Sequence, residues 1–201
     1  MTKEPPVSDL KIAVILGSTR PGRNGKAVAD WVMDRAGART AAEYELVDLA
    51  DHPLPLLDEP VPAARRQYRN EHTKAWAATI AAYDGYVFVT PEYNHGYPAS
   101  LKLAIDYVYS EWRAKPVGFV SYGGMAGGQR AVEQLRQVFA ELHAVTLRDT
   151  VSFHMAWEQF DDNGRPLDEG GCAKAAAVLL DQLDWWGRTL RDGRAARPYE
   201  G

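Results

Sequence analysis

Short apolar runs that each end at a polar, glycine- or proline-rich loop constrain the fold of this chain most strongly. Residues 12–16 are apolar, stop at Gly17, and are followed by a polar loop and a helical pattern that begins near Gly25. Runs 85–90 and 116–120 repeat this order of strand, loop and helix. Continuous apolar runs of this length are typical of strands that are buried on both faces of a parallel sheet.

In the segments between these runs, apolar residues recur at the spacing of an α-helix. The predicted helices cover residues 25–36, 63–82, 99–109, 129–142 and 172–191, and further strands are predicted at 43–49 and 144–153. Five strands that alternate with five helices predict an α/β fold with helices on both faces of a parallel sheet. We expect one domain over residues 10–191, with flexible ends at 1–9 and 192–201.

Composition excludes several classes of protein. The 201 residues carry a net charge of −4, whereas nucleic-acid-binding domains usually have a basic face. No apolar run approaches the roughly 20 residues that cross a bilayer, and residues 1–9 lack the apolar segment of a signal peptide. The single cysteine, Cys172, allows no intrachain disulfide, and the five histidines show no metal-ligand spacing. We therefore expect a cytoplasmic protein without a metal, nucleic-acid or membrane partner.

The loop after the first strand has the features of an anion site. Free backbone N–H groups and the positive end of a helix dipole converge where the helix begins, and such an end binds phosphate. Ser18, Thr19 and Asn24 add neutral hydrogen-bonding groups, and Arg20 adds a planar guanidinium that suits phosphate oxygens. An ordinary connection with exposed polar residues is equally consistent with this loop alone.

The sequence does not match the residue spacing of known phosphate-binding and hydrolase motifs. The Walker motif needs glycine where Arg20 stands and serine or threonine where Ala27 stands. The dinucleotide fingerprint needs a Gly-x-Gly directly after the strand, but Gly17 is followed by serine and threonine. A hydrolase elbow around Ser121 lacks its first glycine, because Phe119 stands there. A site for a single phosphate remains.

The loops after the strands at 85–90 and 116–120 suit a flat heteroaromatic ring. Pro-Glu-Tyr-Asn occupies 91–94 and Ser-Tyr-Gly-Gly occupies 121–124. Glycines let backbone amides approach a ring, tyrosines can stack on it, and asparagine can bond its edge. Each loop alone could equally be a tight turn before a helix. Because ligands in parallel sheets bind beyond the carboxyl ends of the strands, all three loops predict a mononucleotide site at that edge.

Together these motifs resemble the NADPH-dependent FMN reductase family, a flavodoxin-like group that contains quinone, chromate and azo-dye reductases. The resemblance rests on Gly-Ser-Thr-Arg at 17–20, on 91–94 with Leu-Lys-Leu-Ala-Ile-Asp at 101–106, and on 121–124, and runs from about residue 11 to 142. It implies a flavodoxin-like three-layer fold with a five-stranded parallel sheet of order 2-1-3-4-5. It also implies non-covalent FMN as cofactor and NAD(P)H as co-substrate.

The resemblance assigns roles to residues of the three loops. The implied contacts are Ser18, Arg20, Asn24 and Gly25 for the FMN phosphate, Pro91, Glu92, Tyr93 and Asn94 for the isoalloxazine ring, and Ser121, Gly123 and Gly124 on its other side. Many relatives carry serine where this chain has Arg23 or Asn24, so Arg20 is the phosphate contact that we expect most firmly. Tyr97, Arg130 and residues 54–57 are candidates for the rim of the pocket.

The expected activity is that of an FMN-dependent NAD(P)H oxidoreductase with a ping-pong mechanism. Its electron acceptor would be a quinone, an azo compound, a metal oxyanion or free flavin. No acid–base residue is needed, because the flavin carries the chemistry. A flavodoxin-type electron carrier is an alternative, although carriers that dock by charge are usually more acidic than −4; a flavin-dependent sensor is another. The resemblance also implies a homodimer or homotetramer.

Overall fold

A parallel sheet forms the centre of the molecule. The computed structural model describes residues 10–200, so the predicted flexible segment 1–9 lies outside the described residues. The strands are β1 (Lys11–Leu16), β2 (Glu43–Asp48), β3 (Gly85–Pro91), β4 (Pro116–Tyr122), β5 (Val145–Thr146) and β6 (Val151–Phe153). Their order is β2-β1-β3-β4-β5, with β6 also paired to β4, and all pairings are parallel. The predicted α/β fold and the order 2-1-3-4-5 are confirmed.

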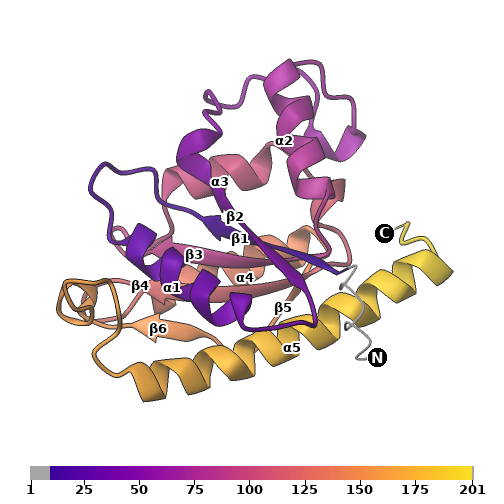
Figure 1. The fold of residues 1–201 in the computed structure, drawn as a ribbon. Helices are drawn as coiled ribbons and strands as arrows, with labels where there is room; N and C mark the ends of the chain where they lie inside the picture. Colours follow the sequence, from indigo (N-terminus) through magenta and orange to yellow (C-terminus); the bar gives the residue numbers. More distant parts are fainter. Residues whose placement is uncertain (1–9, 201) are drawn as a thin grey trace, which may run out of the picture.

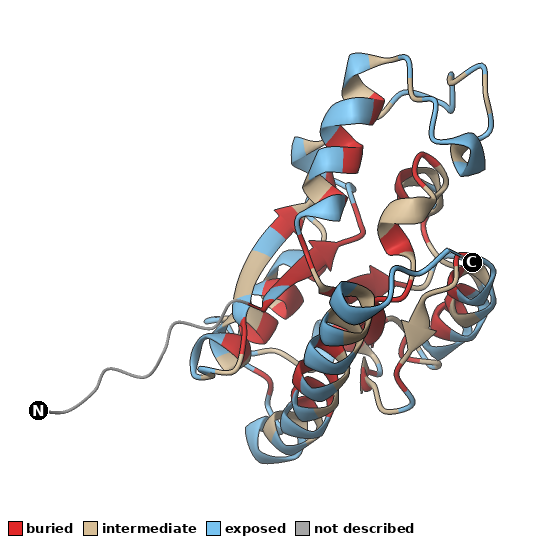
Figure 2. Cartoon of the chain, turned by 90° about the vertical axis from the view of Figure 1, so that its right-hand side faces the viewer, coloured by how far each residue is buried: buried red, intermediate tan, exposed pale blue. Residues whose placement is uncertain are grey.

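Helices cover both faces of this sheet (Figure 1). They are α1 (Gly25–Gly37), α2 (Glu71–Ala81), α3 (Ala99–Asp106), α4 (Gln129–Glu141) and α5 (Glu169–Ala196). Alternate residues of β1 enter different cores: Ile12 and Val14 pack with α1 and α5, whereas Ala13 and Ile15 pack with α2, α3 and α4. Buried positions therefore lie along the sheet and the inner helix faces, while the outer face of α5 is exposed (Figure 2). Within residues 10–200, no helix combines the length and apolarity needed to cross a bilayer.

The predicted fifth strand, 144–153, is wrong as one continuous element. β5 pairs with the beginning of β4 and β6 with its end, and the polar residues 148–150 between them leave the sheet. The Arg136 guanidinium on α4 donates to the carbonyl oxygens of Leu147 and Arg148, which satisfies backbone groups at the interruption. Within residues 10–200, the sheet therefore has six strands instead of five.

Two helices, α2 and α5, differ most in length from the prediction. α2 begins at Glu71, not at residue 63, because the Glu59 carboxylate accepts hydrogen bonds from the backbone N–H groups of Arg69 and Asn70 just before it. α5 continues to Ala196, so the boundary predicted at residue 192 falls inside this helix. Its last turns are held because Arg194 donates to the Ala114 carbonyl oxygen and pairs with Asp84 at 2.8 Å.

Candidate functional site

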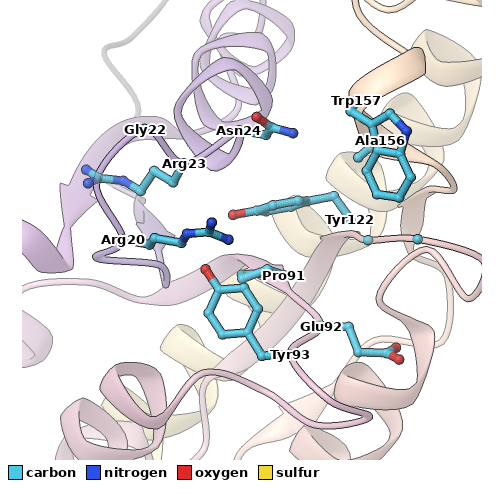
Figure 3. A pocket seen from close by; sticks show the side chains of 12 residues that line it. Arg20, Gly22, Arg23, Asn24, Pro91, Glu92, Tyr93, Tyr122, Ala156 and Trp157 are labelled. Atoms are coloured by element: carbon cyan, nitrogen blue, oxygen red, sulfur yellow. The ribbon is translucent and has the colours of Figure 1, made fainter.

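A cavity of about 380 Å³ opens where β1, β3 and β4 end (Figure 3). It is lined by Arg20, Gly22, Arg23, Asn24, Pro91, Glu92, Tyr93, Tyr122, Gly123, Gly124, Ala156 and Trp157. These residues come from the loops after the three strands and from the segment after β6. Small-molecule sites usually enclose roughly 300–1,000 Å³, so the cavity is large enough for one.

The beginning of α1 and the Arg20 side chain form the side of this cavity with the features of an anion site. Asn24 is the N-cap of α1 but makes no side-chain capping hydrogen bond, and the first turn contains no acidic residue. The N–H groups of a first helical turn have no partner within the helix. The Arg20 guanidinium extends into the cavity beside the Tyr122 ring (Figure 3). This combination of helix end and cation suits a phosphate.

Arg23 plays a different part from Arg20. Its guanidinium pairs with the carboxylate of Asp48 at the end of β2, and both side chains are largely buried. The backbone N–H of Arg23 also donates to the carbonyl oxygen of Arg20 at 3.2 Å. Arg23 therefore fixes the loop against β2, and its charge is balanced by Asp48.

Tyr122 presents a buried hydroxyl group to the loop between β1 and α1. The residue is only 6% exposed, and its buried hydroxyl makes no well-aligned hydrogen bond among the described residues, although the Ser18 hydroxyl and the Gly25 N–H lie close enough to lower its pKa. Burial raises the pKa of this hydroxyl, so it stays protonated. Gly25 makes room for it, because a Cβ at this position would lie 2.3 Å from the hydroxyl oxygen. A buried hydroxyl donor without a well-aligned partner, next to a helix N-terminus, fits the phosphate or ribityl chain of FMN.

Tyr93 and Ser18 join the first loop to the second. Their hydroxyl oxygens lie 2.7 Å apart, and Ser18 is almost completely buried. Tyr93 and Gly96 exchange two backbone hydrogen bonds around Asn94 and His95, which both adopt left-handed conformations. This tight turn carries the Asn94 side chain to the exposed tip, outside the cavity.

The Glu92 carboxylate is held by α4. It accepts a hydrogen bond from the backbone N–H of Arg130 and forms an ion pair with the Arg130 guanidinium. The Glu92 side chain is only 5% exposed, so the pair neutralises a carboxylate at the edge of the cavity. This arrangement positions the loop after β3 and pairs the Glu92 charge with that of Arg130.

Backbone hydrogen bonds give Gly123 and Gly124 their position. Gly123 donates to the Phe153 carbonyl oxygen at 3.1 Å, while Ala156 and Met155 donate at 3.0 Å to the carbonyl oxygens of Gly123 and Gly124. The two glycines thus prolong the pairing between β4 and β6 and present bare backbone to the cavity. The absence of side chains lets a flat ring approach this edge.

Seven of the eleven predicted site residues line the cavity. These are Arg20, Asn24, Pro91, Glu92, Tyr93, Gly123 and Gly124. Ser18 and Gly25 do not line the cavity but support two residues that do: Ser18 hydrogen-bonds to Tyr93, and Gly25 leaves room for Tyr122. Ser121 is buried and donates to the Gly127 carbonyl oxygen. Of the suggested rim residues, Tyr97 packs on the core between the sheet and α2, α3 and α4. Leu54 lines a separate cavity of about 290 Å³.

Gly22, Arg23, Tyr122, Ala156 and Trp157 line the cavity without having been predicted there. Tyr122 lies inside the third motif, and its place just after the buried run 116–120 could have marked it. Trp157 carries no local signal, because it reaches the cavity only through the pairing of β6 with β4. Across residues 10–200, no group of three or more His, Cys, Asp or Glu side chains could hold a metal ion.

The fold and the cavity define a flavodoxin-like α/β protein with a small-molecule site at the carboxyl edge of its sheet. Residues 10–158 match the NADPH-dependent FMN reductase family, and the chain belongs to that family. The chain is similar to FerB, a flavoenzyme NAD(P)H:(acceptor) oxidoreductase from Paracoccus denitrificans, with a TM-score of 0.69. That match covers 90% of this chain and 98% of FerB at 21% identity, which shows a shared fold.

Sequence relatives support the same family. An NAD(P)H-dependent FMN reductase of Schizosaccharomyces pombe is 51% identical over 64% of this chain and 64% of its own length. A similar reductase of a Nectria species is 48% identical, with 66% of its length covered, so both matches span somewhat less than two thirds of these relatives. An NAD(P)H:quinone oxidoreductase of Solanum tuberosum is 32% identical over 85% of this chain and 90% of its own length.

Proposed function

We propose that this protein is an FMN-dependent NAD(P)H oxidoreductase that passes electrons by a ping-pong mechanism to a small-molecule acceptor. The observation that carries this proposal is the buried Tyr122 hydroxyl, which makes no well-aligned hydrogen bond among the described residues and faces an uncapped helix end beside Arg20. The relatives named above are FMN and quinone reductases, which favours free flavin or a quinone as acceptor over an azo compound or a metal oxyanion.

The residues of the cavity divide into two groups in this proposal. Arg20 and the N–H groups of α1 hold the phosphate, and Tyr122 donates a hydrogen bond to an oxygen of the bound molecule. Gly123 and Gly124 let the ring contact backbone, while Pro91 and Tyr93 line the same space. FMN would supply hydride acceptance from NAD(P)H and electron transfer to the acceptor, the protein would supply position and electrostatics, and the second proton that a quinone needs would come from water.

The absorbance spectrum of the purified protein tests the proposal first. We expect a yellow flavin band after addition of FMN, and anaerobic NADH or NADPH should bleach it. Addition of a quinone should restore the band, and catalytic amounts of protein should then oxidise NAD(P)H steadily. A protein that binds no FMN contradicts the proposal. Bound FMN that neither nucleotide reduces would instead indicate an electron carrier, and reduction without turnover on any acceptor would indicate a sensor.

We further propose that the protein is a cytoplasmic homodimer or homotetramer. Leu56, Leu57 and Met125 expose 86%, 53% and 88% of their surface, and such side chains become buried when subunits associate. Light scattering should give a mass of two or four chains. A mass of 22.3 kDa, that of one chain, would contradict this assembly.

A further inference from the structure

Trp157 is a large aromatic side chain exposed at the mouth of the cavity. Its indole is 59% exposed although it lines the same space as Tyr122 and Gly124 (Figure 3). It lies on a short 3₁₀ helix, Ala156–Glu158, directly after β6. An exposed indole that faces a cavity leaves a large apolar surface for a ligand to cover.

The backbone fixes Trp157 relative to the two cavity glycines. Met155 and Ala156 donate to the carbonyl oxygens of Gly124 and Gly123, and both hydrogen bonds are 3.0 Å long. Met155 adopts a left-handed conformation with φ of 47°, which turns the chain so that the next two residues line the cavity. Non-glycine residues adopt this conformation rarely, and it often occurs where a functional side chain must be aimed.

The end of the indole lies against the bare backbone of Gly124. A Cβ at Gly124 would lie 3.5 Å from the Cη2 atom of Trp157, which is van der Waals distance. The indole Nε1 donates to the Glu158 carboxylate at 2.9 Å, so the polar edge of the ring already has a partner. Its faces therefore remain for an apolar contact with any flat ring that lies along Gly123 and Gly124.

We propose that Trp157 is a ring-binding residue of this site and packs against the isoalloxazine ring of bound FMN. The inference rests on the proposed function, since it takes the flavin to be the ligand. Aromatic pairs gain free energy from offset or edge contacts beyond the burial of surface area. A tryptophan on the segment after β6 thus adds to the ring site that the loops after β3 and β4 form.

Titration of the apoprotein with FMN, followed by flavin fluorescence, tests this role. Trp157→Ala should raise the Kd by about three- to tenfold, since an aromatic contact is lost. It should also change the visible circular dichroism of the bound flavin. Trp157→Phe keeps an aromatic ring and should stay within about twofold of the wild type. Trp185→Ala is the matched control, because Trp185 is 61% exposed but lies on α5 against Trp186, away from the cavity.

The outcomes separate the two proposals. If the wild type binds FMN and Trp157→Ala shows the same Kd and the same dichroism, the role of Trp157 is overturned and the proposed function stands. If the wild type binds no FMN, the proposed function fails, and this inference fails with it. Thermal unfolding shows whether each variant is folded. Trp157→Gln, which is non-aromatic but polar and long, replaces the alanine variant if that variant unfolds, and the same rise in Kd is expected.

Discussion

At the scale of single residues, the buried Tyr122 hydroxyl lowers the stability of the apoprotein and, in the proposed function, donates a hydrogen bond to bound FMN. This hydroxyl makes no well-aligned hydrogen bond within residues 10–200, and a buried group without one costs about 1–3 kcal/mol in a folded protein. Tyr122→Phe should therefore leave the apoprotein as stable as the wild type or more stable. The same change should weaken FMN binding by about 0.5–1.5 kcal/mol, because one hydrogen bond to the ligand is lost. Denaturant unfolding and FMN titration measure the two effects.

Opposite signs of these two effects distinguish a ligand-binding hydroxyl from a structural one. Tyr83→Phe is the matched control, because the Tyr83 hydroxyl donates to the Glu45 carboxylate at 2.7 Å, away from the cavity. That variant should lose stability and keep its FMN affinity. Loss of apoprotein stability in Tyr122→Phe, with unchanged FMN affinity, would contradict the role assigned to this hydroxyl.

Arg20 is the charged contact of the proposed phosphate site. Arg20→Ala should weaken FMN binding by about 1.5–3 kcal/mol, which is typical of hydrogen bonds to charged groups. The affinity of the variant should also depend less on salt than that of the wild type, because one charge pair is missing. FMN titration at two ionic strengths measures both effects. Arg65→Ala, at an exposed arginine of the 3₁₀ helix Ala63–Arg65 that does not line the cavity, should change neither.

The site residues that could be predicted are those within the three loop motifs. Arg20, Tyr93 and Gly124 follow buried strands directly, so the parallel sheet alone brings them to one edge. The direction of a side chain within a motif is decided by tertiary hydrogen bonds instead. Ser121 faces Gly127, and Asn94 lies at the tip of a turn that Tyr93 and Gly96 close. No spacing in the sequence specifies these partners.

At the scale of elements, the buried strands were predictable and the element ends were not. β3 and β4 are buried along their whole length, which produces the continuous apolar runs by which they were identified. By contrast, Arg136 on α4 donates a hydrogen bond to a backbone carbonyl oxygen between β5 and β6. The Glu59 carboxylate accepts hydrogen bonds from backbone N–H groups just before α2. The elements end where side chains distant in sequence supply hydrogen bonds, and apolar periodicity does not report such bonds.

The last turns of α5 give a test at this scale. Arg194 connects them to the other end of the sheet, because its guanidinium donates to the Ala114 carbonyl oxygen and pairs with Asp84. Arg194→Ala should destabilise the fold by about 1–3 kcal/mol, since the largely buried Asp84 carboxylate loses its charged partner. Lys174→Ala, at an exposed position of the same helix, should change stability by less than about 0.5 kcal/mol. Denaturant unfolding compares the two; equal effects would contradict the anchoring role of Arg194.

At the scale of the whole molecule, the candidate binding site and the buried charge that affects stability lie at opposite ends of the sheet. The cavity lies at the carboxyl ends of the strands, whereas Lys115 is buried just before β4 begins. Its ammonium group lies 3.0 Å from the Tyr86 hydroxyl and 3.3 Å from the Ile80 carbonyl oxygen at the end of α2. Burial, reinforced by the nearby Arg194 charge, lowers the pKa of Lys115 to about 7, although Asp84 and Glu111 act in the opposite direction.

This lowered pKa predicts how stability depends on pH. Between pH 7 and the ordinary lysine pKa of 10.5, the unfolded chain binds more protons than the folded chain, so the unfolding free energy rises with pH. Lys115→Met lacks this contribution. Relative to the free energy of unfolding of the variant, that of the wild type should therefore increase by about 2 kcal/mol between pH 7 and pH 9. Denaturant unfolding at several pH values measures this shift, and a pH-independent difference would contradict the lowered pKa. Because Lys115 is remote from the cavity, the FMN affinity of the variant at pH 7 should equal that of the wild type.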